Sequence, residues 1–273
     1  MVRTKLPRYL VTLSAPLLLT IVSIPSFLAT VQAQTKTPTQ TTGVRRLKQV
    51  TFEPRKDQPA PTVTVGGGRR YDGKCLPEGQ ASGQSTTEAK SLDQLLTPLL
   101  PSPFTDLQLT VSAHPTFLVY VPQTSAKAVE LTLFARDKDK GEKPIYQTSV
   151  NLSGTPGIVS ITLPATAPDL EMGKDYKWIV ALTCQAGGPT LEDPFVEALI
   201  RRIQPDSALT QLAQAKPLDR VALYAKSGSW YDALANLAEL RKAQPNNTEV
   251  ASAWKELMQG AGLDAIANAP LMK

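Results

Sequence analysis

Two cysteines are the residues of this chain with the clearest capacity for covalent chemistry. Cys75 and Cys184 are the only two cysteines in 273 residues, and an even number favours a disulfide in an oxidising compartment. A bridge between them would close a loop of about 110 residues, for which the chain-entropy model gives roughly 4–5 kcal/mol of stabilisation. Two unrelated thiols are the alternative. A redox pair is not expected, because the sequence lacks the C-x-x-C spacing that lowers a thiol pKa.

Groups that could catalyse a reaction are scarce elsewhere. The single histidine, His114, cannot form a two-histidine metal site, and no serine stands in the G-x-S-x-G pattern of an activated nucleophile. We therefore predict a structural role for His114, no cofactor, no metal and no catalytic residue. The adjacent acids Glu192 and Asp193 leave one alternative open, because a glycosidase needs only two suitably separated carboxylates. Adjacent acids in a turn usually form a solvated face, which weakens that alternative.

The start of the chain has the pattern of a secretory signal. Three basic residues within positions 3–8 precede an apolar, uncharged stretch over residues 9–31, and small residues occupy the two positions that a signal peptidase reads. We expect cleavage between Ala33 and Gln34. An uncleaved anchor is the alternative, because the apolar stretch reaches the roughly 20 residues that span a bilayer. Export would place the protein in the periplasm, outside the cell or in a thylakoid lumen.

The segment after the signal is basic and rich in threonine, proline and glycine. Residues 34–74 carry nine lysines and arginines against three acids, whereas residues 75–273 carry 17 basic and 21 acidic residues. The formal net charge of +5 therefore comes from the first 74 residues and does not indicate a nucleic-acid partner. Because this composition buries little apolar surface, we predict a flexible, solvated tether. A basic arm that docks on an anionic envelope polymer or on an acidic partner is the alternative.

The middle of the chain has the period of β-strands. From about residue 105 to 203, apolar and polar residues alternate in seven short runs separated by turn residues, which predicts an antiparallel β-sandwich. Residues 170–176 resemble the L-x-P-G-x-x-Y corner of fibronectin type III domains, with Met172 in place of the proline. This resemblance implies an immunoglobulin-like sandwich in which the Tyr176 hydroxyl bonds to the loop backbone.

After Pro205 the apolar period changes towards that of helices. The pattern predicts helices over residues 206–214, 217–227, 230–243 and 247–259. Part of this region matches the second half of a tetratricopeptide unit, but one unit cannot form a solenoid. We therefore predict a helical hairpin packed on the sandwich. Trp230 and Tyr231 are candidate aromatic anchors of this packing or, alternatively, residues of an exposed partner-binding groove.

These patterns divide the chain into five parts. The predicted boundaries are 1–33 for the signal peptide, 34–74 for the flexible basic arm, 75–104 for a connecting segment with a short helix, 105–204 for the β-sandwich domain and 205–273 for the helical region. The predicted fold class is α+β. No stretch after the signal is apolar enough to cross a membrane.

Several short motifs follow one another along the chain. They are Phe52-Glu53-Pro54, Gly66-Gly67-Gly68-Arg69-Arg70 leading to Cys75, Gly173-Lys174-x-Tyr176-x-Trp178 ending at Cys184, Gly228-Ser229-Trp230-Tyr231-Asp232-Ala233-Leu234, and Leu237-Ala238-Glu239-Leu240-Arg241. In this order they resemble the exported cyanobacterial family known as domain of unknown function 928. The resemblance implies an extracytoplasmic protein in which Cys75 and Cys184 are matching positions. The family carries no assigned activity, so the resemblance implies no reaction.

The function predicted from these features is binding rather than catalysis. The signal, the sandwich and the scarcity of catalytic groups favour a non-enzymatic exported envelope protein that binds a protein or a polysaccharide. An assembly or accessory factor for another exported protein is one alternative. A glycan hydrolase that uses Glu192 and Asp193 is the other.

Overall fold

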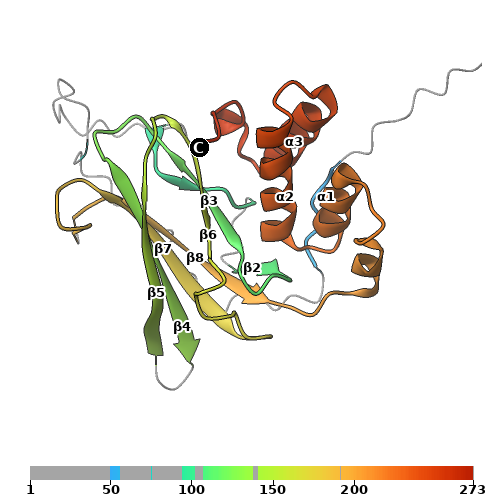
Figure 1. Cartoon of the computed structure of the whole chain (residues 1–273), viewed down its shortest axis with the longest axis horizontal. Helices are drawn as coiled ribbons and strands as arrows, with labels where there is room; N and C mark the ends of the chain where they lie inside the picture. The colour runs from blue at the N-terminus through green and yellow to red at the C-terminus, as the bar shows by residue number, and fades with distance from the viewer. Residues whose placement is uncertain are drawn as a thin grey trace, which may run out of the picture. The chain divides into compact units, whose positions relative to one another are not determined.

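The computed structural model describes residues 50–55, 75, 94–101, 107–137, 141–190 and 192–272, all of which belong to the unit formed by residues 45–273 (Figure 1). The predicted signal peptide with its cleavage site at Ala33 and Gln34 lies outside the described residues. So do most of the predicted arm and most of the connecting segment. Within the described part of the chain, no helix is long and apolar enough to cross a membrane.

The described residues form two β-sheets. The strands are β1 Thr97–Pro98, β2 Leu107–Thr110, β3 Thr116–Val121, β4 Ala128–Asp137, β5 Gly141–Asn151, β6 Gly157–Thr162, β7 Asp175–Thr183 and β8 Phe195–Arg202. One sheet has the order β1-β3-β6 and the other the order β2-β8-β7-β4-β5. Neighbouring strands are antiparallel except β2 and β8, which are parallel. The predicted α+β class and the sandwich of sheets are confirmed at this level.

Alternating side chains place the core between the two sheets. In β4, Val129, Leu131 and Leu133 are fully buried, whereas Glu130 and Thr132 are partly exposed. β3 and β6 contribute further buried aliphatic and aromatic residues. A period of two gives each strand one apolar face, which the opposite sheet covers. The pattern did not predict β1, because a strand of two residues is too short to show alternation.

The loop before β7 holds the predicted tyrosine contact. Tyr176 is 1% exposed, and its hydroxyl oxygen accepts the backbone N–H of Glu171 at 2.9 Å. Gly173 lies in this loop with a φ of +74°, a backbone conformation that favours glycine. The hydrogen bond fixes the turn that leads into β7.

Three helices follow the sandwich. They are α1 Pro217–Lys226, α2 Trp230–Ala243 and α3 Thr248–Gly260, close to the predicted ranges. Pro217 opens α1, where its missing N–H has no helical partner to lose. The Asn247 side chain caps α3 by accepting the N–H groups of Glu249 and Val250 at 2.9 and 3.2 Å. The prediction of a helix over 206–214 is wrong, because only a 3₁₀ turn, η2, forms there at Ser207–Gln211.

Residues 50–55 lie against the helices. Val50 is 2% exposed, the Phe52 ring meets the Trp230 ring edge-on with centroids 4.9 Å apart, and Glu53 N–H donates to the carbonyl oxygen of Ala225 at 3.0 Å. The expectation of a solvated tether therefore does not hold for these six residues. Apolar Val50 and Phe52 supply the buried surface that the composition of the whole arm lacks.

Residues 53–55 pass close to Gly228, which lies between α1 and α2. Its φ is +73°, and a Cβ there would lie 2.7 Å from Arg55 Cγ and 3.3 Å from the carbonyl oxygen of Glu53. Only glycine therefore fits both the turn and the passing segment.

We predict that Gly228→Ala lowers the free energy of unfolding more than Gly173→Ala does. Both positions have positive φ, which costs a non-glycine residue about 1–2 kcal/mol. A Cβ at Gly173 meets nothing within 4 Å, so this variant isolates the backbone cost. Urea unfolding of the two variants gives the difference. Equal losses would mean that residues 53–55 do not pack on Gly228.

Candidate functional site

The start of helix α2 contacts the core of the sandwich through one hydrogen-bonded aromatic cluster. Trp178 of β7 donates its Nε1–H to the Tyr231 hydroxyl oxygen at 2.7 Å. The Tyr231 hydroxyl lies 3.3 Å from the carbonyl oxygen of Leu199 in β8, to which it donates. The Phe117 ring, from the other sheet, lies 5.2 Å from the Trp178 ring and 5.7 Å from the Tyr231 ring. Both sheets and α2 therefore share one core.

Trp230 and Tyr231 are internal residues rather than a contact surface. Their exposed fractions are 0% and 3%, and Trp230 Nε1–H donates to the carbonyl oxygen of Leu99 at 2.8 Å. A partner cannot reach either ring in this structure, so the partner-binding interpretation of these residues is corrected in favour of packing. The physical reason is that α2 is covered on several sides, by α1, by the sheets and by Phe52.

Asp232 is a buried carboxylate at the same end of α2. It is 7% exposed, and its Oδ2 accepts the N–H of Val111 at 2.9 Å. Burial raises the pKa of this carboxyl to about 6, although the hydrogen bonds from Val111 and Thr110 act in the opposite direction. The group ties α2 to the chain after β2. Asp232 belongs to the motif at residues 228–234, and no pattern in the sequence indicated a role for its carboxylate.

Cys75 and Cys184 form a disulfide with their Cα atoms 5.3 Å apart. Cys184 directly follows β7, and the carbonyl oxygen of Cys75 accepts hydrogen bonds from the Thr124 hydroxyl at 2.6 Å and from Ser125 N–H at 2.9 Å. The alternative of two unrelated thiols is therefore not what the structure contains. The bridge joins residue 75 to the end of the five-stranded sheet.

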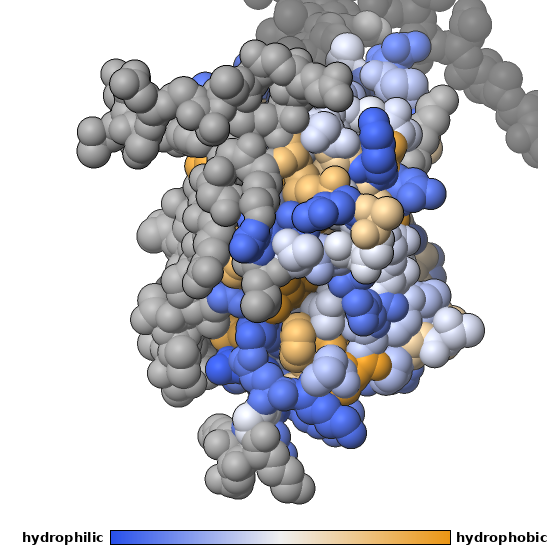
Figure 2. All heavy atoms as spheres, turned by 90° about the vertical axis from the view of Figure 1, so that its left-hand side faces the viewer, coloured by the Kyte–Doolittle hydropathy of each residue, from blue (hydrophilic) through white to orange (hydrophobic). Residues whose placement is uncertain are grey.

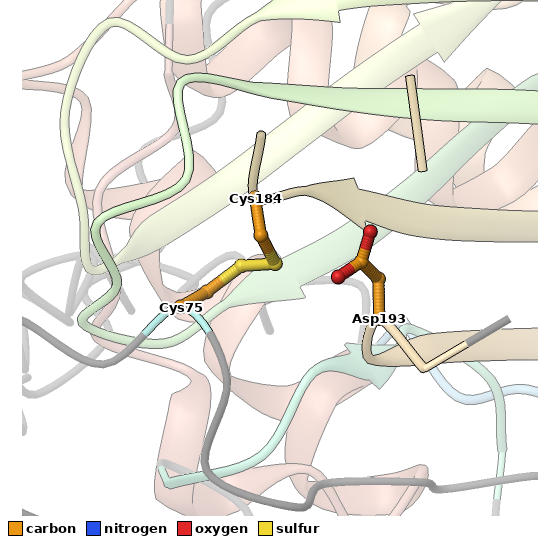
Figure 3. A group of neighbouring side chains, drawn as sticks. All are labelled: Cys75, Cys184 and Asp193. Carbon is orange, nitrogen blue, oxygen red and sulfur yellow. A yellow bond between two sulfur atoms is a disulfide. The ribbon is translucent and has the colours of Figure 1, made fainter. Parts of the chain in front are cut away.

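Asp193 lies beside this disulfide (Figure 3). A carboxylate oxygen of Asp193 and the two sulfur atoms lie within 4.8 Å of one another. Asp193 is 0% exposed, and its Oδ2 accepts Thr190 N–H at 2.7 Å. Its Oδ1 is buried and has no hydrogen-bond partner among the residues that the structure describes. Sequence spacing did not associate Asp193 with the cysteines, because the three come together only through the fold.

Glu192 and Asp193 do not form a pair of carboxylates open to a polymer. Glu192 is exposed, whereas Asp193 is fully buried. A glycosidase needs both groups at one cleft, on either side of the scissile bond. The structure therefore gives no support to this pair as the acid and base of a hydrolase.

His114 takes part in local contacts of the loops between strands. Its Nε2 lies 3.2 Å from the carbonyl oxygen of Ala167 and 3.2 Å from Oδ1 of Asp169. These contacts connect the turn before β3 with the loop after β6.

The five-stranded sheet ends in an open edge at β5. This strand pairs with β4 and, among the described strands, with no other. Lys143, Pro144 and a register shift opposite them protect its first part. The remaining residues, 145–151, have no such protection from the described part of the chain, and the side chains of Gln147, Ser149 and Asn151 are exposed.

The other sheet has a covered edge. Beside β6, Ile158 N–H donates to the carbonyl oxygen of Pro270, and Met272 N–H donates to that of Ile158, both at 2.8 Å. The C-terminal segment thus supplies hydrogen bonds to β6 that nothing in the described chain supplies to β5.

The outer face next to β5 combines charged and apolar side chains. Lys177 pairs with Glu142 and lies 3.8 Å from Glu197, and its ammonium is 5.2 Å from the Phe134 ring centroid. Burial raises the pKa of Glu197, while Lys177 lowers it. Figure 2 shows hydrophilic and hydrophobic side chains next to one another on the side of the molecule that carries β4 and β5. Opposite charges largely compensate here, which does not favour a highly charged partner.

We predict that Tyr231→Phe destabilises the protein by about 1–3 kcal/mol, because the buried Trp178 N–H loses its acceptor. Chemical unfolding measures the loss. A double-mutant cycle with Trp178→Phe isolates the pairwise interaction. Strictly additive losses in this cycle would contradict a direct hydrogen bond between the two side chains.

We predict that Asp232→Asn removes a pH dependence of stability. The carboxyl pKa rises from 3.8 to about 6 on folding, so the folded state holds this proton more tightly. Stability contributed by the protonated group is complete below about pH 4 and is lost as the pH rises through 6, by up to about 3 kcal/mol. Asparagine retains an acceptor for Val111. Unfolding free energies at pH 4 and 7 test this, and parallel profiles of the two proteins would contradict it.

A family model described as Domain of Unknown Function (DUF928) matches residues 66–271 of the chain. No curated protein and no solved structure matches the chain significantly. The matched range covers all the described strands of the sandwich, the disulfide and all three helices. The protein therefore belongs to the DUF928 family.

Proposed function

We propose that the chain is a non-enzymatic exported envelope protein that binds an extended segment of a partner protein along β5. The observation that carries this proposal is the open part of β5, residues 145–151, which is hydrogen-bonded on one side by β4. An edge strand presents a row of unpaired N–H and C=O groups and is a template for another strand. Strand addition is an established mode of peptide recognition.

Two features favour a protein over a polysaccharide at this edge. The ladder of backbone groups repeats at the spacing of a polypeptide strand, which a glycan does not match. The exposed Gln147, Ser149 and Asn151 lie on one face of the strand and offer polar contacts at alternate positions. Alternate side chains supply specificity when main-chain hydrogen bonds supply affinity.

An immunoglobulin-like sandwich is the finer description that we propose for the fold. β3 and β6 lie in one sheet and β4, β7 and β8 in the other, which corresponds to strands B and E against C, F and G of that fold. The hydrogen bond between Tyr176 and the Glu171 backbone supports the same assignment. In this description, α1 and α2 form a single tetratricopeptide-like hairpin that packs on the sandwich.

Export to an oxidising compartment of a cyanobacterium is also part of the proposal. The disulfide fits such a compartment, and the predicted signal supplies the route. The periplasm, the thylakoid lumen and the cell exterior all satisfy these conditions. A transient assembly factor remains the second candidate, because an edge strand also suits an unfolded or nascent partner segment.

Position-specific photo-crosslinking in intact cells tests the proposed surface. A photoreactive residue at Ser149 is expected to trap one defined protein, whereas the same group at Lys255, exposed on α3, traps none or a different one. Adducts that contain glycan, or identical adducts from both positions, would contradict a protein partner at β5. Adducts that form with the mature partner, and not only with its newly synthesised chain, favour a stable complex over an assembly factor.

Single proline substitutions at residues 147–150 test the binding mode with the trapped partner. In an antiparallel strand, N–H groups of alternate residues face opposite sides. We therefore expect the two substitutions that remove an N–H facing β4 to lower Tm, because they break the β4–β5 ladder. The two that remove an N–H facing away from β4 should leave Tm unchanged and weaken binding at least tenfold. If those two bind normally, strand addition at this edge is refuted.

A further inference from the structure

We propose that the Cys75–Cys184 bridge is a reversible redox site, which a dithiol reductant opens and whose reduced form Asp193 stabilises. This inference rests on a carboxylate beside a disulfide and does not depend on the β5 edge. The spacing of the cysteines gave no reason to expect a redox pair. The group that alters this expectation is Asp193, which lies in the connection between Cys184 and β8.

The first argument is the cost of Asp193 in the oxidised protein. Its Oδ1 is buried without a hydrogen-bond partner in the described structure, and a buried polar group without a partner loses its hydration with nothing to replace it. Thr190 N–H satisfies only the other oxygen. Figure 3 shows the carboxylate turned towards the bridge. A disulfide has no proton to donate, so it leaves this oxygen unsatisfied.

Reduction of the bridge creates a hydrogen-bond donor for Asp193. Opening the bridge converts two sulfurs into two S–H groups, and a thiol is a hydrogen-bond donor. The two sulfurs and one carboxylate oxygen of Asp193 already lie within 4.8 Å of one another. A side-chain rotation of the freed cysteine brings its S–H to Asp193. The carboxylate therefore favours the reduced form over the oxidised form.

The step is a two-electron thiol–disulfide exchange. A thiolate of the dithiol attacks the sulfur of Cys184, which is partly exposed. The Cys75–Cys184 bond breaks, a mixed disulfide forms on Cys184, and Cys75 leaves as a thiolate that takes up a proton. The second thiol of the reductant then attacks its own sulfur in the mixed disulfide and releases Cys184, which is also protonated. The protein gains two electrons and two protons, and the dithiol becomes a disulfide.

The test is the equilibrium constant for reduction of the full chain by dithiothreitol, measured from free thiols at fixed pH. Asp193→Asn keeps one side-chain oxygen as an acceptor for Thr190 N–H but removes the second acceptor and the negative charge. We expect its equilibrium constant to fall about tenfold, which corresponds to a potential about 30 mV more negative. Glu192→Gln alters the adjacent, exposed carboxylate and should match the wild type within twofold.

An unchanged equilibrium constant in Asp193→Asn would overturn the proposal, because Asp193 would then only hold its turn. If this variant does not fold, the infrared S–H stretch of the reduced wild-type chain decides. An S–H band at lower frequency shows a thiol that donates to a strong acceptor. Its loss in Cys75→Ser or in Cys184→Ser identifies the cysteine that carries this thiol. Two unshifted bands would overturn the proposal.

Discussion

The hydrogen bond from Trp178 to Tyr231 joins the five-stranded sheet to helix α2, and the rest of the architecture depends on it. Both side chains are buried, so neither group has water as an alternative partner. Phe117 brings the second sheet to the same point, and Asp232 attaches the next helical residue to the chain after β2. The helices are therefore part of the core of the sandwich and not an appended domain.

This packing makes the aromatic residues at the start of α2 internal. The aromatic motif at residues 228–234 looks like a recognition surface in the sequence, but it is used internally. The C-terminal segment, which follows the helices, covers the edge of β6. The edge of β5, on the side away from the helices in Figure 1, is left for other contacts. The partner binding that we propose therefore uses the end of the described sandwich that lies away from the helices.

Periodicity alone predicted the elements in which apolar residues recur at a regular spacing. β4 and β7 alternate cleanly, and the helix predicted over 230–243 matches α2 at Trp230–Ala243. Residues 50–55 have no period, and their contacts are with helices far along the chain. Whether Trp230 faces a partner or the core depends on how many surfaces surround α2, which the sequence of one helix does not contain.

The candidate sites were harder to predict for a related reason. The disulfide followed from the number of cysteines, but the place of Asp193 beside it depends on how the turn before β8 meets the end of β7. An open strand edge is a property of sheet order, and single-strand patterns do not give that order. Apolar residues flank Asp232 in its motif, and they do not indicate whether its carboxylate is buried. The packed structure shows that it is.

Native-state hydrogen exchange of the full chain tests most directly whether helices and sandwich form one core. If α2 is held by Trp178 and Asp232 as described, its most protected amides exchange with the same opening free energy as those of β7. Both then track global unfolding across a denaturant series. Exchange of α2 through a separate opening of lower free energy, with β7 still protected, would contradict a shared core.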